Sequence, residues 1–233
     1  YPIAVICIAA IVVAVILLKV IPTFAALFTS LGAELPFPTR VVIAASNFLA
    51  RYFIFFVIGI GAAIFFFRRY YKTYRGRRVI DGAMLKAPIL GLILRKIAVA
   101  RFCRTLATLT SSGVPILESL DITARTAGNA IVEDAILETR KSVENGKTLI
   151  EPLRDSEVFP NMVVQMIGVG EQTGALDSML NKIAEFYEDE VDIAVAGLVK
   201  LLEPVMIFIL GVIIGGIVIA MYLPMFTLIN KIG

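Results

Sequence analysis

The apolar residues of this chain fall into three long runs separated by polar stretches. The clearest run is residues 201–224, LLEPVMIFILGVIIGGIVIAMYLP, in which no charged side chain follows Glu203. About 20 apolar residues at ~1.5 Å rise per residue cross the ~30 Å hydrocarbon core of a bilayer as one helix. Residues 1–22 and 48–67 are of similar length, and each carries its one charged side chain near an end. The pattern predicts three transmembrane helices.

The segments beside these runs contain helix-breaking residues or are short. Pro22 closes the first run, and residues 23–47 contain Gly32 and two prolines. We therefore expect an exposed connection at residues 23–47. Residues 225–233 form a short tail after the last run.

Residues 79–200 show the periodicity of helices, and no β-like alternation persists along them. The clearest case is residues 175–200, where one face is apolar and acidic or amide side chains face away from it. Its apolar row is Leu176, Leu180, Ile183, Tyr187, Val191, Ala194 and Leu198. Glycine and proline turns divide the whole stretch into shorter helices. The predicted fold is an all-α membrane protein with three transmembrane helices plus a cytoplasmic antiparallel bundle of about six helices.

A basic juxtamembrane segment at residues 68–78 predicts the orientation of the chain. Six cationic side chains directly follow the second apolar run: Arg68, Arg69, Lys72, Arg75, Arg77 and Arg78. Cytoplasmic flanks of transmembrane helices carry an excess of Lys and Arg. We therefore expect residues 79–200 in the cytoplasm and residues 23–47 and 225–233 in the periplasm. The six side chains either fix this topology alone or also bind anionic lipid headgroups.

The last apolar run carries small residues on one helical face. These residues are Gly211, Gly215, Gly216 and Ala220, and the first two form a G-x-x-x-G pattern. Small residues let two helices approach closely in lipid, although glycine is also common in transmembrane helices in general. We interpret this small-residue face as a helix-packing surface, filled from this chain, from a second copy or from another protein.

The residue types present exclude several classes of function. The chain has 233 residues, no histidine and a mean hydropathy of +0.87. Histidine-based triads and histidine-ligated zinc or haem sites are therefore excluded within it, and it contains no phosphate-binding or dinucleotide motif. Cys7 lies in a predicted membrane span and Cys103 in the polar part of the chain, so the two cannot pair and are expected to be reduced. We predict no enzyme activity, no cofactor and no metal.

The charge pattern bears on the partners. The formal net charge is +3, but residues 79–203 hold more acidic than basic side chains, so nucleic acid is not an expected partner. The acidic cluster at residues 185–192 points in several directions around a helix. We interpret it as a solvated helix face and not as a catalytic or metal site.

Three stretches of the chain resemble the type II secretion F family. They are LTSSGVPILESL at residues 109–120, FPNMVVQMIGVGEQTGALDSMLNKIAEFYEDEVD at residues 159–192 and LEPVMIFILGVIIGGIVIAMYLPMF at residues 202–226. The segments YEDEVD and AMYLP are similar to the PilC-type branch, the inner-membrane platform proteins of type IV pili. The resemblance implies two homologous cytoplasmic helical domains and three membrane helices. This chain would supply the second domain and all three spans, and the first domain would precede Tyr1.

The same resemblance implies a function and partners. It implies a non-enzymatic inner-membrane platform on which hexameric cytoplasmic ATPases for assembly and retraction act, so that pilins enter or leave the pilus. The implied partners are these ATPases, pilins, other inner-membrane proteins of the pilus machine, membrane lipids and further copies of the chain in a homo-oligomer. The small-residue face then becomes a candidate pilin contact.

Two alternative functions stay open. One is the platform of a type II secretion system. The other, from a different class, is a membrane transporter or channel, which should place ionisable groups well inside its spans. In this sequence Lys19, Arg51 and Glu203 all lie near predicted span ends.

Two surface turns are candidate ATPase-facing sites under this resemblance. The first turn is Gly113, Val114 and Pro115, and the second is Glu171, Gln172, Thr173 and Gly174. Glycine and proline solve backbone problems in turns, so a purely structural role is the alternative for them. We expect Glu171 and Gln172 to be the better probes, because a turn does not require their side chains.

The basic segment yields a topological prediction. Single cysteines at Ala33 and Ser156, in a background without Cys7 and Cys103, should react differently with an impermeant thiol reagent in cells permeabilised only at the outer membrane. We expect labelling at residue 33 and protection at residue 156, because the basic segment holds residues 79–200 in the cytoplasm. Preferential labelling at residue 156 would overturn this orientation.

Overall fold

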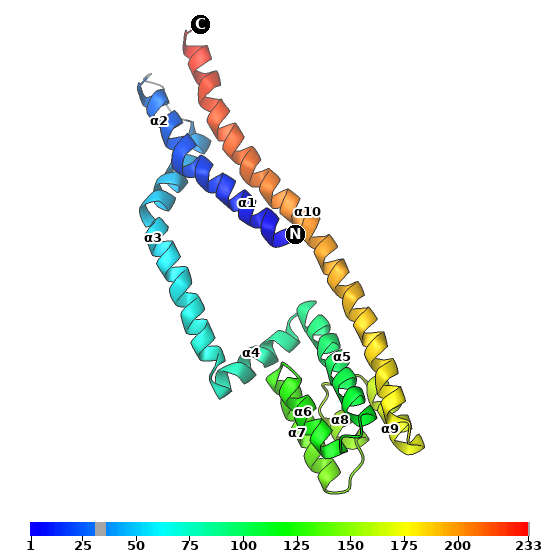
Figure 1. Cartoon of the computed structure of the whole chain (residues 1–233). Coiled ribbons are helices and arrows are strands. Elements are labelled where there is room, and N and C mark those ends of the chain that lie inside the picture. Colours follow the sequence, from blue (N-terminus) through cyan, green and yellow to red (C-terminus); the bar gives the residue numbers. More distant parts are fainter. Residues whose placement is uncertain (31–35, 233) are drawn as a thin grey trace. The chain divides into compact units, whose positions relative to one another are not determined.

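Every regular element among the described residues is a helix. The computed structural model describes residues 1–30 and 36–232 (Figure 1). The elements in chain order are α1 (Pro2–Val15), the π-helical turn η1 (Ile16–Val20), α2 (Ile21–Ser30), α3 (Phe37–Tyr71), α4 (Tyr74–Lys86), α5 (Leu90–Ser111), α6 (Ile116–Thr126), α7 (Ala130–Glu144), α8 (Ile150–Asp155), α9 (Asn161–Thr173) and α10 (Leu176–Ile232). The all-α prediction is therefore confirmed.

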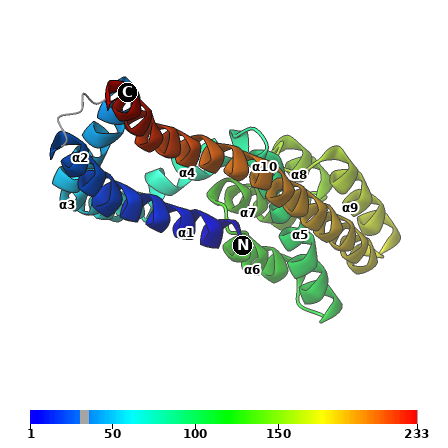
Figure 2. The same cartoon turned by 90° about the horizontal axis from the view of Figure 1, so that it is seen from above.

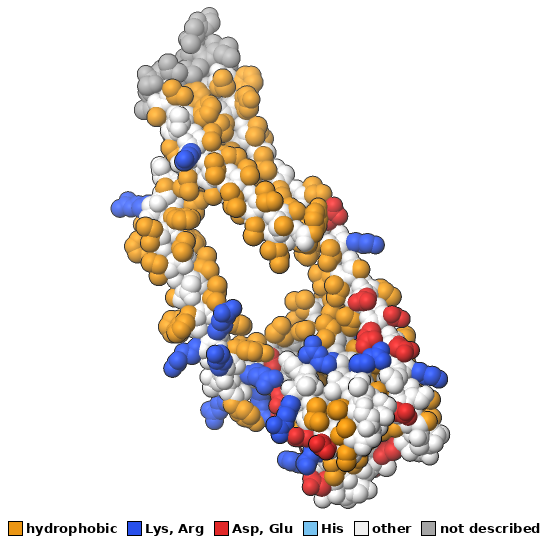
Figure 3. All heavy atoms as spheres, viewed as in Figure 1, with side chains coloured by type: hydrophobic (Ala, Val, Ile, Leu, Met, Phe, Trp, Pro, Cys, Tyr) orange, Lys and Arg blue, Asp and Glu red, His pale blue; other side chains and the backbone are white. Residues whose placement is uncertain are grey.

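The chain divides into two compact units. Residues Tyr1–Phe65 and Gly197–Gly233 form one, here called the membrane unit, and Phe66–Ala196 form the other, the polar unit. Apolar side chains cover the visible helices of the first, and most of the acidic and basic side chains lie on the second (Figure 3). Within the described residues, three helices are long and apolar enough to cross a membrane: Pro2–Phe28, Phe37–Tyr71 and Leu176–Phe226. The cytoplasmic placement of the polar unit and the exact membrane boundaries stay predictions.

The first apolar helix does not end at Pro22, so that prediction is wrong. Helical structure continues through α2 to Ser30, and α3 begins at Phe37 instead of at residue 48. Most of the described part of the expected connection at residues 23–47 is thus helical; Gly32 and Ala33 lie outside the described residues.

The π-helical turn before Pro22 leaves one carbonyl without a backbone donor. The N–H of Ile21 donates to the carbonyl of Ile16, five residues earlier. The next carbonyl in this pattern is that of Leu17, and Pro22 has no N–H to offer it. The hydroxyl of Ser46 on α3, a buried side chain, donates to the Leu17 carbonyl instead. A hydroxyl from a neighbouring helix therefore makes the helical proline tolerable in lipid.

The same device recurs near the start of α3. Pro224 lies inside α10 and cannot donate to the carbonyl of Ala220, four residues earlier. The hydroxyl of Thr39 donates to that carbonyl over 2.6 Å, and Thr39 is buried. Two hydroxyls of α3 thus fix it to the first apolar helix and to α10 within the membrane unit, where Figures 1 and 2 show these helices side by side.

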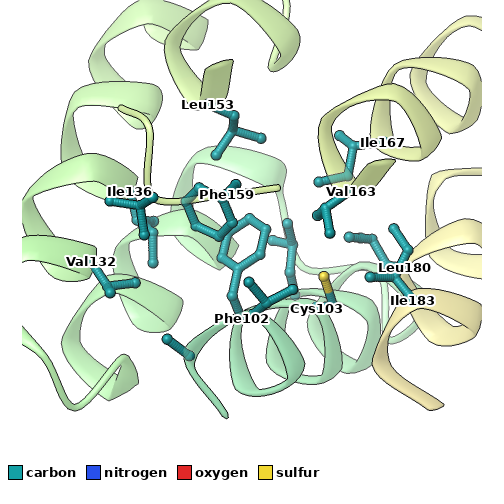
Figure 4. Close-up of a cluster of buried hydrophobic side chains, with 14 of the residues drawn as sticks. Phe102, Cys103, Val132, Ile136, Leu153, Phe159, Val163, Ile167, Leu180 and Ile183 are labelled. Atoms are coloured by element: carbon teal, nitrogen blue, oxygen red, sulfur yellow. The ribbon is translucent and has the colours of Figure 1, made fainter. Parts of the chain in front are cut away.

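The polar unit has a single apolar core around α5. Phe102 of α5 stacks on Phe159, which precedes α9, with ring centroids 4.8 Å apart. Figure 4 shows this pair together with side chains from α7, α8, α9 and α10. The fully buried large side chains are Phe102, Leu106, Leu120, Ile136, Leu153, Ile167, Leu180, Ile183, Val99, Val132, Val163 and Val164. The apolar row predicted for residues 175–200 enters this core through Leu180, Ile183 and Tyr187.

Two glycines are required where the backbone turns into and out of α4. A Cβ at Gly76 would lie 2.0 Å from the carbonyl oxygen of Tyr70, and a Cβ at Gly91 would lie 2.3 Å from that of Leu85. Both clashes are with backbone, which cannot move aside as a side chain can. These glycines set the tight corners at both ends of α4.

The contact between Thr39 and Ala220 gives a stability prediction. Thr39→Val keeps the shape of the side chain and removes the donor, so we expect a loss of about 0.6 to 1.7 kcal/mol in detergent-induced unfolding of the purified chain. Thr39→Ser should retain most of the stability. Pro224→Ala returns a backbone N–H to the Ala220 carbonyl, so Thr39→Val should cost less in that background. An equal cost in both backgrounds would contradict the assigned role of the hydroxyl.

Candidate functional site

Charged side chains set the register between α5 and α10. Arg104 donates from Nε and Nη2 to the two carboxylate oxygens of Glu188, over 2.9 and 2.7 Å, and from Nη1 to Asn181 Oδ1 over 3.0 Å. Nearer the start of α5, Lys96 binds Glu190 over 2.6 Å. Arg104 comes after Lys96 on α5, whereas its partners on α10 come before Glu190, the partner of Lys96. The two helices are therefore antiparallel.

This register brings the two sequence-predicted turns to one end of the polar unit. The turn at residues 113–115 follows the end of α5, and the turn at residues 171–174 precedes the start of α10. Because the helices are antiparallel, the end of α5 lies beside the start of α10. We call residues 113–115 and 171–174 together the turn end.

Both glycines of the turn end have backbone roles. Gly113 has φ +80° and is followed by a Val114 N–H that donates to Leu109 O over 3.0 Å. Gly174 has φ +69° and is followed by an Ala175 N–H that donates to Gly170 O over 2.9 Å. Each pattern closes a helix with a residue in the left-handed region, where glycine avoids the strain of a side chain. Pro115 precedes α6 as its N-cap residue.

Glu171 has a structural role outside its own turn that the sequence analysis did not predict. Both of its carboxylate oxygens accept the N–H of Leu149 over 3.1 Å, and Leu149 is the N-cap residue of α8. A carboxylate at a helix N-terminus satisfies a backbone donor that has no intrahelical partner. Of the four residues in that turn, Gln172 is exposed and Thr173 uses its hydroxyl on the Val169 carbonyl, so Gln172 is the better probe.

The acidic cluster at residues 185–192 is partly engaged in ion pairs. Glu188 and Glu190 bind Arg104 and Lys96, so the description of the cluster as a solvated face holds only in part. The guanidinium of Arg104 lowers the pKa of Glu188 by hydrogen bonding, and the carboxylate raises the pKa of Arg104 in the same way. Among the described residues, no group of three acidic or cysteine side chains is arranged to hold a metal ion.

An open groove of about 530 Å³ runs beside these ion pairs. Its lining is Ile97, Ala100, Arg101, Arg104, Thr105, Glu188, Val191 and Asp192. Arg101 approaches the α6–α7 turn so closely that a Cβ at Gly128 would lie 2.4 Å from its Nη1 atom. The mixture of both charges with apolar side chains suits contact with a protein segment.

The basic segment divides into two parts. Arg77 binds Glu133 over 3.1 Å, and Arg78 binds Asp134 and stacks on the Tyr74 ring at 4.2 Å. These two residues therefore fasten α4 to α7, a role beyond topology and lipid. The other four cations, Arg68, Arg69, Lys72 and Arg75, form no ion pair with any described residue.

Asp81 is a structural residue that the sequence pattern did not single out. It is 3% exposed and accepts the Tyr71 hydroxyl over 2.9 Å and the Ala130 N–H over 2.7 Å. Ala130 is the first residue of α7, so this carboxylate joins the end of α3 to the start of α7. The sequence feature that could have indicated this role is a single acidic residue within the basic, amphipathic helix α4.

The small-residue face of α10 has one residue that is buried against another helix and three glycines that are not. Ala220 is 1% exposed and accepts the Thr39 hydroxyl through its carbonyl. A Cβ at Gly211, Gly215 or Gly216 would meet no heavy atom within 4 Å from the described residues outside the helix's own backbone. The three glycines are therefore not filled by another helix of the described chain.

The described residues define an all-helical protein with three helices that could span a membrane and a separate polar unit. The chain belongs to the family described as Type II secretion system (T2SS), protein F, which matches residues 102–224. The match covers the later part of α5, all of α6 to α9 and most of α10. The family resemblance inferred from the sequence is thereby confirmed.

Individual relatives point to one branch of this family. Over its whole length the chain is 51% identical to the type IV pilus assembly protein PilC of Myxococcus xanthus and 44% identical to that of Pseudomonas aeruginosa. It is 33% identical to the type II secretion system protein F of Pseudomonas aeruginosa. The chain spans 56%, 63% and 58% of the lengths of these three relatives.

The Arg104–Glu188 pair makes stability dependent on pH. Because folding lowers the pKa of Glu188 below its ordinary value of 4.5, the pair stabilises the fold above that value. The stabilisation is lost as pH falls through the lowered pKa. At pH 7, Glu188→Gln should lower the free energy of unfolding by at most about 1 kcal/mol, since solvent screens the pair, and the melting temperature should fall accordingly. The variant should also lose less stability than the unmodified chain when the pH falls from 7 to 3, as measured by circular dichroism in detergent.

A local ion pair provides the control for this measurement. Asp121 and Arg125 pair within α6 at i,i+4 spacing, so Asp121→Asn should change stability by less. If Glu188→Gln has the same pH dependence as the unmodified chain, the register contact is not a stabilising one.

Proposed function

We propose that this chain is part of a non-enzymatic inner-membrane platform for type IV pilus biogenesis. In this proposal the polar unit lies in the cytoplasm and receives hexameric ATPases that drive assembly and retraction. The membrane unit contacts pilins as they enter or leave the pilus. Other inner-membrane pilus proteins, further copies of the chain and membrane lipids complete the set of partners.

The observation that carries the proposal is the 51% identity, over the whole chain, to a relative named as a type IV pilus assembly protein. The architecture supports the proposal. One helix, α10, belongs to the polar unit at its start and to the membrane unit from Gly197 onward. Such a helix gives a force applied to the polar unit a direct covalent route into a membrane span.

The turn end is the proposed ATPase-facing surface. Two turns far apart in sequence lie at that end of the polar unit, and α10 starts there before it continues into its predicted span. A motor acting at the turn end would act on the end of α10 that is remote from the span. The exposed amide of Gln172 offers a contact that neither the turn nor the α8 cap uses.

The two alternatives are less well supported. A type II secretion platform corresponds to the relative at 33% identity, below the 44 to 51% of the two pilus proteins. A transporter needs polar contacts for a solute within its spans. The groove between α1 and α10, about 300 Å³, is lined by eight apolar side chains from Ile6 to Ile213.

The turn end yields a prediction about motor binding. Gln172→Arg should weaken co-purification of the ATPases with the full-length protein and reduce the number of surface pili, because it adds bulk and charge without touching the α8 cap. Glu138→Arg, at an exposed position on α7, serves as the control. Unchanged ATPase binding and piliation in Gln172→Arg would remove the turn end from the proposal.

The small-residue face yields a prediction about contacts in the membrane. Gly215→Leu should reduce crosslinking to a second copy or to pilin, because overpacking a close helix contact typically costs roughly 1 to 3 kcal/mol. Leu210→Ile keeps the side-chain volume and should be mild. Protein level and surface pili are measured beside crosslinking. Normal contacts and normal pili in Gly215→Leu would show that the glycines only reflect ordinary membrane-helix composition.

A further inference from the structure

The turn between α4 and α5 carries large apolar side chains that nothing in the polar unit covers. Ile89 is 61% exposed, Leu90 53% and Leu92 67%. Pro88 beside them is also exposed. Contiguous exposed apolar side chains on a charged unit mark a surface that meets an apolar partner. We call residues 88–92 the apolar turn.

The backbone of this turn is strained in a way that presents Ile89 outward. Ile89 has φ 66° and ψ −61°, and the N–H of Leu90 donates to Pro88 O over 2.7 Å. These values define a γ-turn of the rare form, with a β-branched residue at its centre. Such a conformation costs on the order of 1 to 3 kcal/mol and persists only where the surroundings fix it. The Gly91 backbone, packed on the Leu85 carbonyl, supplies that constraint.

Cations flank the apolar turn on both sides. Lys86 ends α4 and Arg95 lies in α5; both are exposed, and neither forms an ion pair with a described residue. An apolar tip between basic side chains is the composition of segments that enter the headgroup region of an anionic bilayer. A protein partner for the same surface would need acidic groups around an apolar pocket.

The register of α5 against α10 places the turn beside the part of α10 where that helix leaves the polar unit. Lys96 of α5 pairs with Glu190 of α10. Leu90 lies six residues before Lys96, and because the helices are antiparallel it faces α10 near residue 196, six residues after Glu190. Five residues after residue 196, the same helix enters the predicted span at residues 201–224. The other chain exit of the polar unit, at Phe66, leads into α3, the second span candidate.

We propose that the apolar turn inserts into the headgroup region of the anionic bilayer that the chain itself spans. The turn then acts as a third attachment of the polar unit to the membrane, besides α3 and α10. The unpaired cations Lys86 and Arg95 bind lipid phosphates beside it. This inference rests on the membrane spans and not on a role in pili.

The test uses the whole chain in nanodiscs that hold one copy each, with a 3:1 mixture of phosphatidylcholine and phosphatidylglycerol. Cys7 is replaced by Ala, and Cys103 is kept because it is fully buried and burial raises the pKa of its thiol. A nitroxide is attached at Leu92→Cys. The control nitroxide is attached at Val169→Cys, another exposed apolar position of the polar unit.

Collision with oxygen, which concentrates in lipid, and with a nickel chelate, which stays in water, reports the position of each nitroxide. We expect Leu92→Cys to lose nickel collisions and gain oxygen collisions relative to Val169→Cys. The double variant Lys86→Gln, Arg95→Gln should shift residue 92 back toward water, as should pure phosphatidylcholine. Nickel collisions at residue 92 equal to those at residue 169 would overturn the proposal. Protection of residue 92 from both reagents would also overturn it, because protein would then cover the turn.

Discussion

Arg104 holds Glu188 and Asn181 at once, and Lys96 holds Glu190, so α5 and α10 can pack in one antiparallel register only. The apolar core beneath these contacts supplies the larger part of the stability, because exposed ion pairs contribute little. The register nevertheless decides what lies at each end of the polar unit. It gathers the turns at residues 113–115 and 171–174 at one end and the apolar turn at residues 88–92 at the other.

The membrane unit solves a different problem, that of proline within apolar helices. Pro22 and Pro224 each deprive a carbonyl of its backbone donor, and lipid offers no replacement. The hydroxyls of Ser46 and Thr39, both on α3, donate hydrogen bonds to these two carbonyls. Proline in a membrane helix therefore becomes a point of attachment for a neighbouring helix. This arrangement joins parts of the chain that are far apart in sequence.

Local pattern was enough to predict the helices, the three apolar runs and the apolar face of residues 175–200, because each depends on spacing along the chain. Local pattern is not enough where a residue distant in sequence changes which local structure is stable. The sequence around Pro22 predicts a helix end, because it does not show that the Ser46 hydroxyl lies beside the Leu17 carbonyl. The cap that Glu171 provides for α8 and the pairing of Arg77 with Glu133 likewise depend on tertiary contacts. The proposed function rests on the family motifs, since no residue pattern specifies a pilus by its chemistry.

The most direct measurement replaces the aligned part of the Myxococcus xanthus pilus assembly protein with this chain, leaving the rest of that protein to complete the chimera. Surface pili are then counted in a strain that lacks the native protein. A parallel chimera with the type II secretion protein F of Pseudomonas aeruginosa is scored for secretion. A pilus platform predicts that pili return in the first strain and that secretion returns weakly or not at all in the second. Stable, membrane-inserted chimeras that restore secretion but no pili would contradict the assignment.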